Sequence, residues 1–68
     1  MNTQIYDEIR IDYCVVGEPA VLLVVDYADG IERRIMTNSP VVKMTIEDAR
    51  NTCIETETHI IKTFGFNI

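Results

Sequence analysis

The sequence has few of the residues that build enzyme and cofactor sites: no tryptophan, one histidine, two cysteines and three glycines in 68 residues. One histidine and two cysteines, with no Cys-x-x-Cys pair, argue against a Cys/His zinc centre. The chain also lacks a P-loop, Gly-x-Gly-x-x-Gly and Gly-x-Ser-x-Gly. We therefore expect no enzymatic activity, no cofactor and no metal.

Positive charge is scarce as well, because six basic side chains stand against eleven acidic ones and the formal net charge is −5. A nucleic-acid binder needs a basic stripe that displaces counterions from phosphates, so direct nucleic-acid binding is not expected. The apolar run Val21–Val25 is far too short to span a membrane, and nothing resembles a signal peptide. Cys14 and Cys53 fall short of a disulfide framework, which favours a reduced, cytoplasmic protein.

The length of the chain predicts one domain over residues 1–68, near the lower limit of what folds unaided. Hydrophobic residues make up 47% of the sequence, which excludes compositional disorder. The core of such a domain is small, so oligomerisation or partner binding would add useful burial.

The first half of the sequence predicts three strands. Apolar residues alternate with polar ones from Ile5 to Val15, and Ala20–Tyr27 is rich in β-branched residues. Gly17-Glu18-Pro19 and Asp29-Gly30 are turn signals, and the second leads into a strand over Ile31–Thr37.

The second half predicts a helix. Thr45 suits an N-cap, and Gly65 suits the position after the helix end. Apolar residues recur at helical spacing between them, at Ile46, Ala49, Cys53, Ile60 and Phe64. The sequence thus predicts an α+β fold of order β-β-β-α: a three-stranded antiparallel meander packed on one C-terminal helix, with a short fourth strand allowed at Val41–Lys43.

Two-residue turns would place one set of alternating side chains against the helix and leave an apolar stripe on the other face of the meander. An apolar stripe that holds an aromatic residue and a methionine inside a charged rim has the anatomy of a protein interface. The alternative is a solvated face on which long charged side chains lie over the stripe. The predicted interface comprises Cys14, Val21, Leu23, Val25, Tyr27 and Met36, with Arg34 and Asp12.

Charged residues fall on the side assigned to the core as well. We expect Asp26 to pair with Arg33 across the hairpin, joined by Glu57, because an unpaired buried charge is costly. The exposed side of the helix would carry a second, acidic surface formed by Glu47, Asp48 and Glu55.

One stretch resembles a known family. "DYADGIERRI" followed by "MTIEDARNTCIETE" is similar to the order in HicB-like antitoxins, a hairpin with Asp-Gly and then a helix that opens at Thr45, Glu47 and Ala49. Asn51 stands one place early for that pattern. The small size, acidity and lack of catalytic groups also resemble phage-encoded inhibitors of bacterial defence, including anti-CRISPR proteins.

These features favour a non-enzymatic binding protein that inhibits a larger protein by occupying its apolar or basic surface, as a phage anti-defence protein or an antitoxin would. The alternative is a structural homodimer, or small assembly subunit, whose sheets pack face to face through the same stripe.

Overall fold

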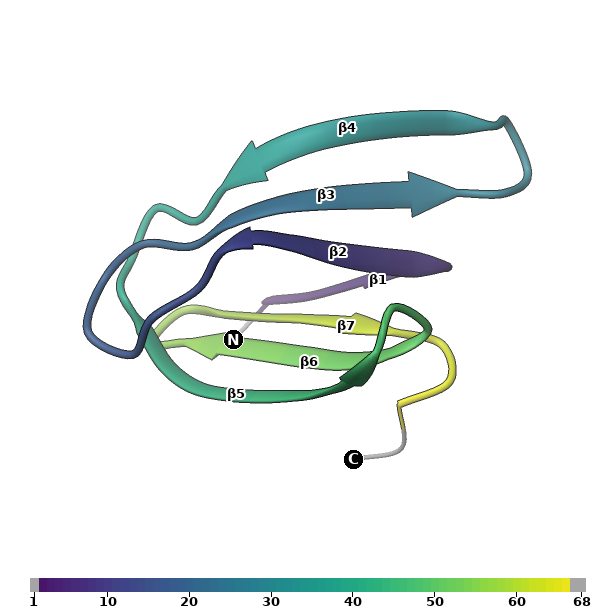
Figure 1. The fold of residues 1–68 in the computed structure, drawn as a ribbon. Coiled ribbons are helices and arrows are strands. Elements are labelled where there is room, and N and C mark those ends of the chain that lie inside the picture. Colours follow the sequence, from purple (N-terminus) through teal and green to yellow (C-terminus); the bar gives the residue numbers. More distant parts are fainter. Residues whose placement is uncertain (1, 67–68) are drawn as a thin grey trace.

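The computed structural model describes residues 2–66, and these residues form seven strands and no helix. The strands form two sheets, one above the other in Figure 1. Their bounds are β1 Asn2–Tyr6, β2 Glu8–Tyr13, β3 Val21–Asp26, β4 Ile31–Met36, β5 Val41–Asp48, β6 Asn51–Thr56 and β7 His59–Thr63.

The predicted meander is present in part as the antiparallel sheet β2-β3-β4. Its first strand spans only Glu8–Tyr13, because Ile5 and Tyr6 belong to β1 of the other sheet. Its register differs from the expected one by two residues, because Leu22, and not Val24, opposes Ile35. The turn between β3 and β4 is longer than expected, and it spans residues 27–30. A shift of two residues preserves the side-chain parity, so Leu22 and Val24 face the core as the sequence predicts.

The predicted C-terminal helix is wrong, and so is the α+β class. Residues 41–63 form β5, β6 and β7, and the fold is all-β. β7 pairs antiparallel with β6 and parallel with β1, which gives a mixed sheet of order β1-β7-β6-β5. The first and last strands therefore lie side by side in this sheet, with β1 the most distant strand in Figure 1.

Buried threonines explain why this part of the chain forms strands and not the predicted helix. Thr52, Ile54 and Thr56 alternate along β6, and all three are buried. β-Branched residues favour strands, and a threonine can occupy an interior position when its hydroxyl is hydrogen-bonded. Within the sheet Thr63 Oγ1 accepts a hydrogen bond from the N–H of Thr52 at 3.1 Å. The hydrophobic pattern of the sequence does not show the period of two along β6, because several of these core positions carry polar side chains.

The residues expected to begin and end the helix have other roles. Thr45 lies within β5 opposite Cys53 and caps nothing. Asp48 shapes the turn into β6, because its Oδ1 accepts hydrogen bonds from the backbone N–H of Arg50 and the side-chain amide of Asn51, both at 2.9 Å. Gly65 lies against that turn, where a Cβ atom would come within 2.6 Å of the carbonyl oxygen of Arg50.

The hydrophobic core lies between the inner faces of the two sheets. Main-chain hydrogen bonds link the sheets at both ends, from Ile9 N–H to the carbonyl of Ala49 at 2.8 Å and from Gly17 N–H to the carbonyl of Val41 at 2.8 Å. Sequence-distant strands thus enclose one shared interior. Its buried members are Ile9, Ala20, Leu22, Val24, Val41, Ile54 and Ile61.

Two isoleucines test this packing. Ile54 is 0% exposed in β6, whereas Ile46 is 47% exposed in β5. We expect Ile54→Ala to lower the free energy of unfolding by about 2–5 kcal/mol, the usual range for a buried isoleucine. Ile46→Ala removes the same atoms and should cost less than about 1 kcal/mol. Urea denaturation measures both, and a larger loss for Ile46, as a helix with Ile46 on its core face would give, contradicts the two-sheet packing.

Candidate functional site

The outward face of β2-β3-β4, which we call the outer face, carries its side chains in three rows across the strands. At one end Val25 lies between Glu8 and Glu32, and in the middle Leu23 lies between Arg10 and Arg34. At the other end Val21 lies between Tyr13 and Met36. These are an acidic, a basic and an apolar row, and directly opposed side chains in a sheet are in reach of each other.

The predicted interface maps only in part onto this face. Val21, Leu23, Val25, Arg34 and Met36 lie on it. A bulge between Ile11 and Tyr13 reverses the parity at the end of β2, so Tyr13 lies on the outer face and Cys14 packs against the core. The sequence predicted Cys14 on the outer face, because a bulge leaves no distinct mark in an alternating pattern.

Tyr27 lies just beyond the end of β3, next to Glu8 of the acidic row. The guanidinium carbon of Arg50 is 6.0 Å from the centre of its ring. Burial, a hydrogen bond to Glu8 and the negative charge of Glu8 together raise the pKa of Tyr27 above its ordinary value. The phenol therefore stays neutral at physiological pH.

Charged side chains cover much of the stripe. Val25, between two glutamates, is only 7% exposed, and Leu23 is half-buried between two arginines. Within residues 2–66 the ion pairs are Arg34 with Asp12, at 2.5 Å, and Arg10 with Glu8, at 3.9 Å. The apolar row is the open part of the face, since Met36 is 67% exposed and Tyr13 is exposed as well.

The predicted pair of Asp26 with Arg33 does not form. Asp26 opposes Ile31, and Arg33 opposes Val24, because of the two-residue shift in register. Glu57 lies in the turn between β6 and β7 and joins no ion pair among the described residues.

The acidic helix surface is also wrong, because there is no helix to carry it. Glu47 and Asp48 end β5, and Asp48 is engaged in the turn to β6. Those hydrogen bonds from Asn51 and Arg50 lower the pKa of Asp48 below its ordinary value. Glu55 lies in β6 opposite Lys43. The three carboxylates therefore form no common helical face.

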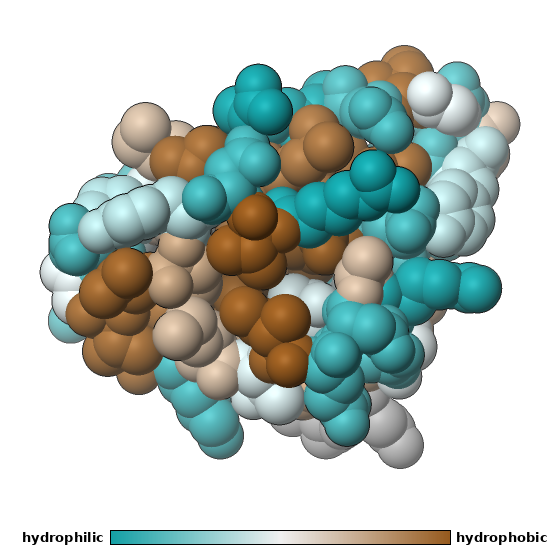
Figure 2. All heavy atoms as spheres, viewed as in Figure 1, coloured by the Kyte–Doolittle hydropathy of each residue, from teal (hydrophilic) through white to brown (hydrophobic). Residues whose placement is uncertain are grey.

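A second apolar surface follows the edge strand β5, and we call it the β5 margin. Met44 and Ile46 oppose Ile54 and Thr52, so they belong to the inner face of their sheet, yet they stay exposed. Cys14 Sγ lies 3.3 Å from Met44 Sδ at this margin. Figure 2 shows hydrophobic side chains gathered over the middle of this side, where β2 passes above β5 and β6. The three-stranded sheet is too narrow to cover it.

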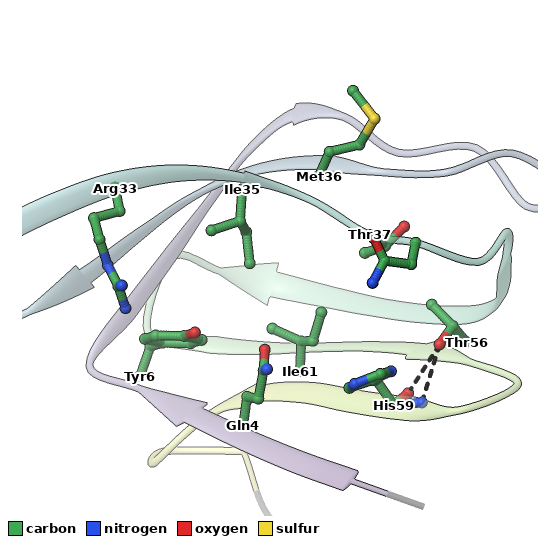
Figure 3. Close-up of a pocket in the computed structure, with 10 residues that line it drawn as sticks. Gln4, Tyr6, Arg33, Ile35, Met36, Thr37, Thr56, His59 and Ile61 are labelled. Carbon is green, nitrogen blue, oxygen red and sulfur yellow. Dashed lines mark hydrogen bonds between the residues drawn. The ribbon is translucent and has the colours of Figure 1, made fainter.

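A cleft of about 320 Å³ opens on the opposite side of the molecule, between β4 and the pair β1–β7. We call it the β4–β1 cleft. Arg33 and Ile35 point into it from above, and Gln4, Tyr6, His59 and Ile61 line it from below (Figure 3). Met36 lines the cleft too, with the end of its side chain directed to the other side of β4 (Figure 3). No sequence pattern predicted this cleft, because it depends on the pairing of β1 with β7.

The two thiols offer little nucleophilic chemistry. Cys14 is half-buried and Cys53 is buried, and burial is the main cause that raises the pKa of each thiol above its ordinary value. Cys53 opposes Lys62 and Thr45 in neighbouring strands, and no histidine is placed to activate it. Both are free cysteines.

Thiol modification tests these environments. A raised pKa leaves less thiolate at neutral pH, and the thiolate is the reactive form. We expect iodoacetamide to modify both cysteines of the folded protein more slowly than free cysteine, and Cys14 before Cys53. Mass spectrometry of timed samples measures the order, with the urea-unfolded chain as the control in which both react alike. Faster reaction of Cys53 contradicts its placement in β6.

Residues 2–66 include no group of three or more histidine, cysteine and acidic side chains that could hold a metal ion. No helix in this part of the chain is long and apolar enough to cross a membrane. Comparisons of the chain with protein-family models, with curated proteins and with solved structures give no match. The segment on which the resemblance to HicB-like antitoxins rests forms strands, so the helix that the resemblance implied is absent.

Proposed function

We propose that this protein is a non-enzymatic binding protein that attaches to the surface of a larger protein through its outer face, and inhibits that protein by occupying the surface. The observation that carries the proposal is the order of the three rows, with the exposed apolar row of Tyr13, Val21 and Met36 beside the charged ones. Tyrosine, methionine and arginine are the residue types enriched at protein interfaces.

The rows also favour a different protein over a second copy as the partner. The basic row lies in the middle, between the acidic and the apolar rows. A two-fold axis along the strands or across them that covers the whole face brings this middle row over itself. Arg10 and Arg34 would then meet the same arginines of the second copy, and such like-charge contacts are unfavourable.

The three rows predict which surface chemistry a partner would need. The apolar row needs an apolar patch, the acidic row of Glu8 and Glu32 needs basic side chains, and the basic row needs acidic ones. The net charge of −5 would steer the whole protein toward a partner with a basic surface. Charges at the rim of the interface, on either protein, would speed association more than they would tighten the complex.

A homodimer is the second candidate, and the free edge of β4 favours it. Thr37 N–H donates to the carbonyl of Ala20, so backbone groups of Glu32 and Arg34 point away from β3. Two such edges could pair antiparallel about Arg33, with each Glu32 opposite Arg34 of the other copy. The same register sets the two Arg33 side chains against each other, which weakens it.

A matched pair of variants tests the outer face. Met36 is 67% exposed on the apolar row, and Phe64 is 68% exposed just after β7. Both should tolerate glutamate without loss of folding, because little burial is removed. We expect Met36→Glu to abolish capture of a specific partner from a host lysate, and Phe64→Glu to leave capture unchanged.

Light scattering at several concentrations, with reducing agent present, separates the two candidates. A monomer of 7.8 kDa with a captured partner of defined identity supports the proposal. A stable dimer that Met36→Glu leaves intact and Arg34→Glu dissociates supports the edge-paired homodimer instead. Capture that both glutamate variants reduce equally contradicts a role for the apolar row.

A further inference from the structure

We propose that a second copy of this chain pairs with the β5 margin, edge to edge and antiparallel, so that the two four-stranded sheets join into one continuous sheet. β5 is the outermost strand of its sheet and lies at the bottom of Figure 1. The outer face belongs to the other sheet and stays free in this arrangement, so either proposal can fail without the other.

The first argument is the direction of the backbone groups in β5. Thr52 of β6 turns its N–H to β7, where Thr63 Oγ1 accepts it, so Cys53 turns its own backbone to β5 and to its partner Thr45. Met44 and Ile46, on either side of that partner, therefore direct their N–H and C=O groups away from β6. Within residues 2–66 no other segment bonds these groups. Such a row of unpaired groups is a template for another strand.

The second argument is that one register of two β5 strands is self-complementary. A two-fold axis at Thr45 sets Met44 of each copy opposite Ile46 of the other, so each free N–H faces a free C=O. In the same register Thr45 opposes its own copy, and Lys43 opposes Glu47 of the other chain. Paired threonines and opposite charges are both favourable across antiparallel strands.

The edge of β4 gives a second copy a less favourable register. Pairing about Arg33 sets two arginines directly against each other, and like charges in that position are destabilising. At the centre of β5 the residue that meets its own copy is the uncharged Thr45. Of these two free edges, β5 therefore suits a second copy better.

The third argument is the apolar surface that the pairing would cover. Met44 is 40% exposed and Ile46 is 47% exposed, because β2 contacts β6 and β7 and stops short of β5. The two-fold axis stands perpendicular to the joined sheet, so both three-stranded sheets lie on its same side. The two β2 strands would then stand about three strand spacings apart, roughly 14 Å. Met44 and Ile46 of both copies fill that space and leave water.

The ends of β5 limit how far the pairing extends. The other sheet already occupies this edge there, since Gly17 N–H donates to the carbonyl of Val41 and Ile9 N–H donates to the carbonyl of Ala49. Bulges near both points bend the strand as well. The pairing is therefore confined to residues 43–47. A contact this short predicts a weak dimer, with a dissociation constant on the order of 0.1 mM, so denaturation at micromolar protein reports on the monomer.

Sedimentation equilibrium and amide hydrogen exchange over a range of concentrations test the proposal, with reducing agent present. The average mass should rise from 7.8 kDa toward twice that value as the protein approaches about 1 mM. The amides of Met44 and Ile46 should become protected over the same range, whereas Thr45, which bonds β6, should be protected throughout. A protein that stays monomeric at about 1 mM overturns the proposal. Protection that develops at Glu32 and Arg34 instead also overturns it, because it places the contact at β4.

A charge exchange tests the register. Lys43→Glu sets two glutamates against each other at both ends of the pairing and should weaken the dimer by about fivefold or more. Adding Glu47→Lys reverses each pair and should restore the affinity to within about twofold of the original.

Arg34→Glu is the matched control, because it makes the same change of charge on the outer face. It should change the dissociation constant less than about twofold, since exposed distant charges are screened. A dispersed amide spectrum confirms that each variant folds. Equal weakening by Lys43→Glu and Arg34→Glu, or no recovery in the double variant, overturns the proposal.

Discussion

The whole structure depends on contact between two sheets that could not persist apart. The three-stranded sheet contributes Leu22 and Val24, and the four-stranded sheet contributes Ile54 and Ile61, all buried. Among residues 2–66 neither sheet has any other cover for these side chains, and a sheet with one uncovered apolar face is unstable in water. The turns, the strand pairing and the exposed surfaces must all be compatible with this single layer of contact between the sheets.

The two sheets differ in width, and that difference creates the surfaces where ligands can bind. β2 packs over β6 and β7, while β3 contacts β1, so the sheets overlap only in part. On one side β5 extends past β2 and exposes Met44 and Ile46. On the other side β4 extends over β1 and encloses the β4–β1 cleft. Within residues 2–66 no further strand or helix covers either margin.

The sequence predicted the strand order of one sheet, with its register two residues off, and misassigned the other sheet. β-Branched residues identified β3, and its inward face followed from the turns and from the alternating pattern of the strand before it. In β6 and β7 the inward positions include Thr52, Thr56 and Thr63, which a hydrophobic pattern counts as polar. With these set aside, the remaining isoleucines and Cys53 matched a helical period by coincidence. The interior threonines depend on partners such as Asp48 O for Thr52 Oγ1, which no local pattern reveals.

The sequence likewise predicted part of the candidate site and missed the rest. Most residues of the outer face could be inferred from the turns and the alternating pattern, but the bulge at Tyr13 and the parallel pairing of β1 with β7 could not. The outer face and the β4–β1 cleft share β4, whose period of two sends Arg33 and Ile35 into the cleft and Arg34 to the outer face. Met36, at the end of β4, belongs to the apolar row and lines the cleft as well. The two surfaces are therefore not independent, because a change at Met36 alters both.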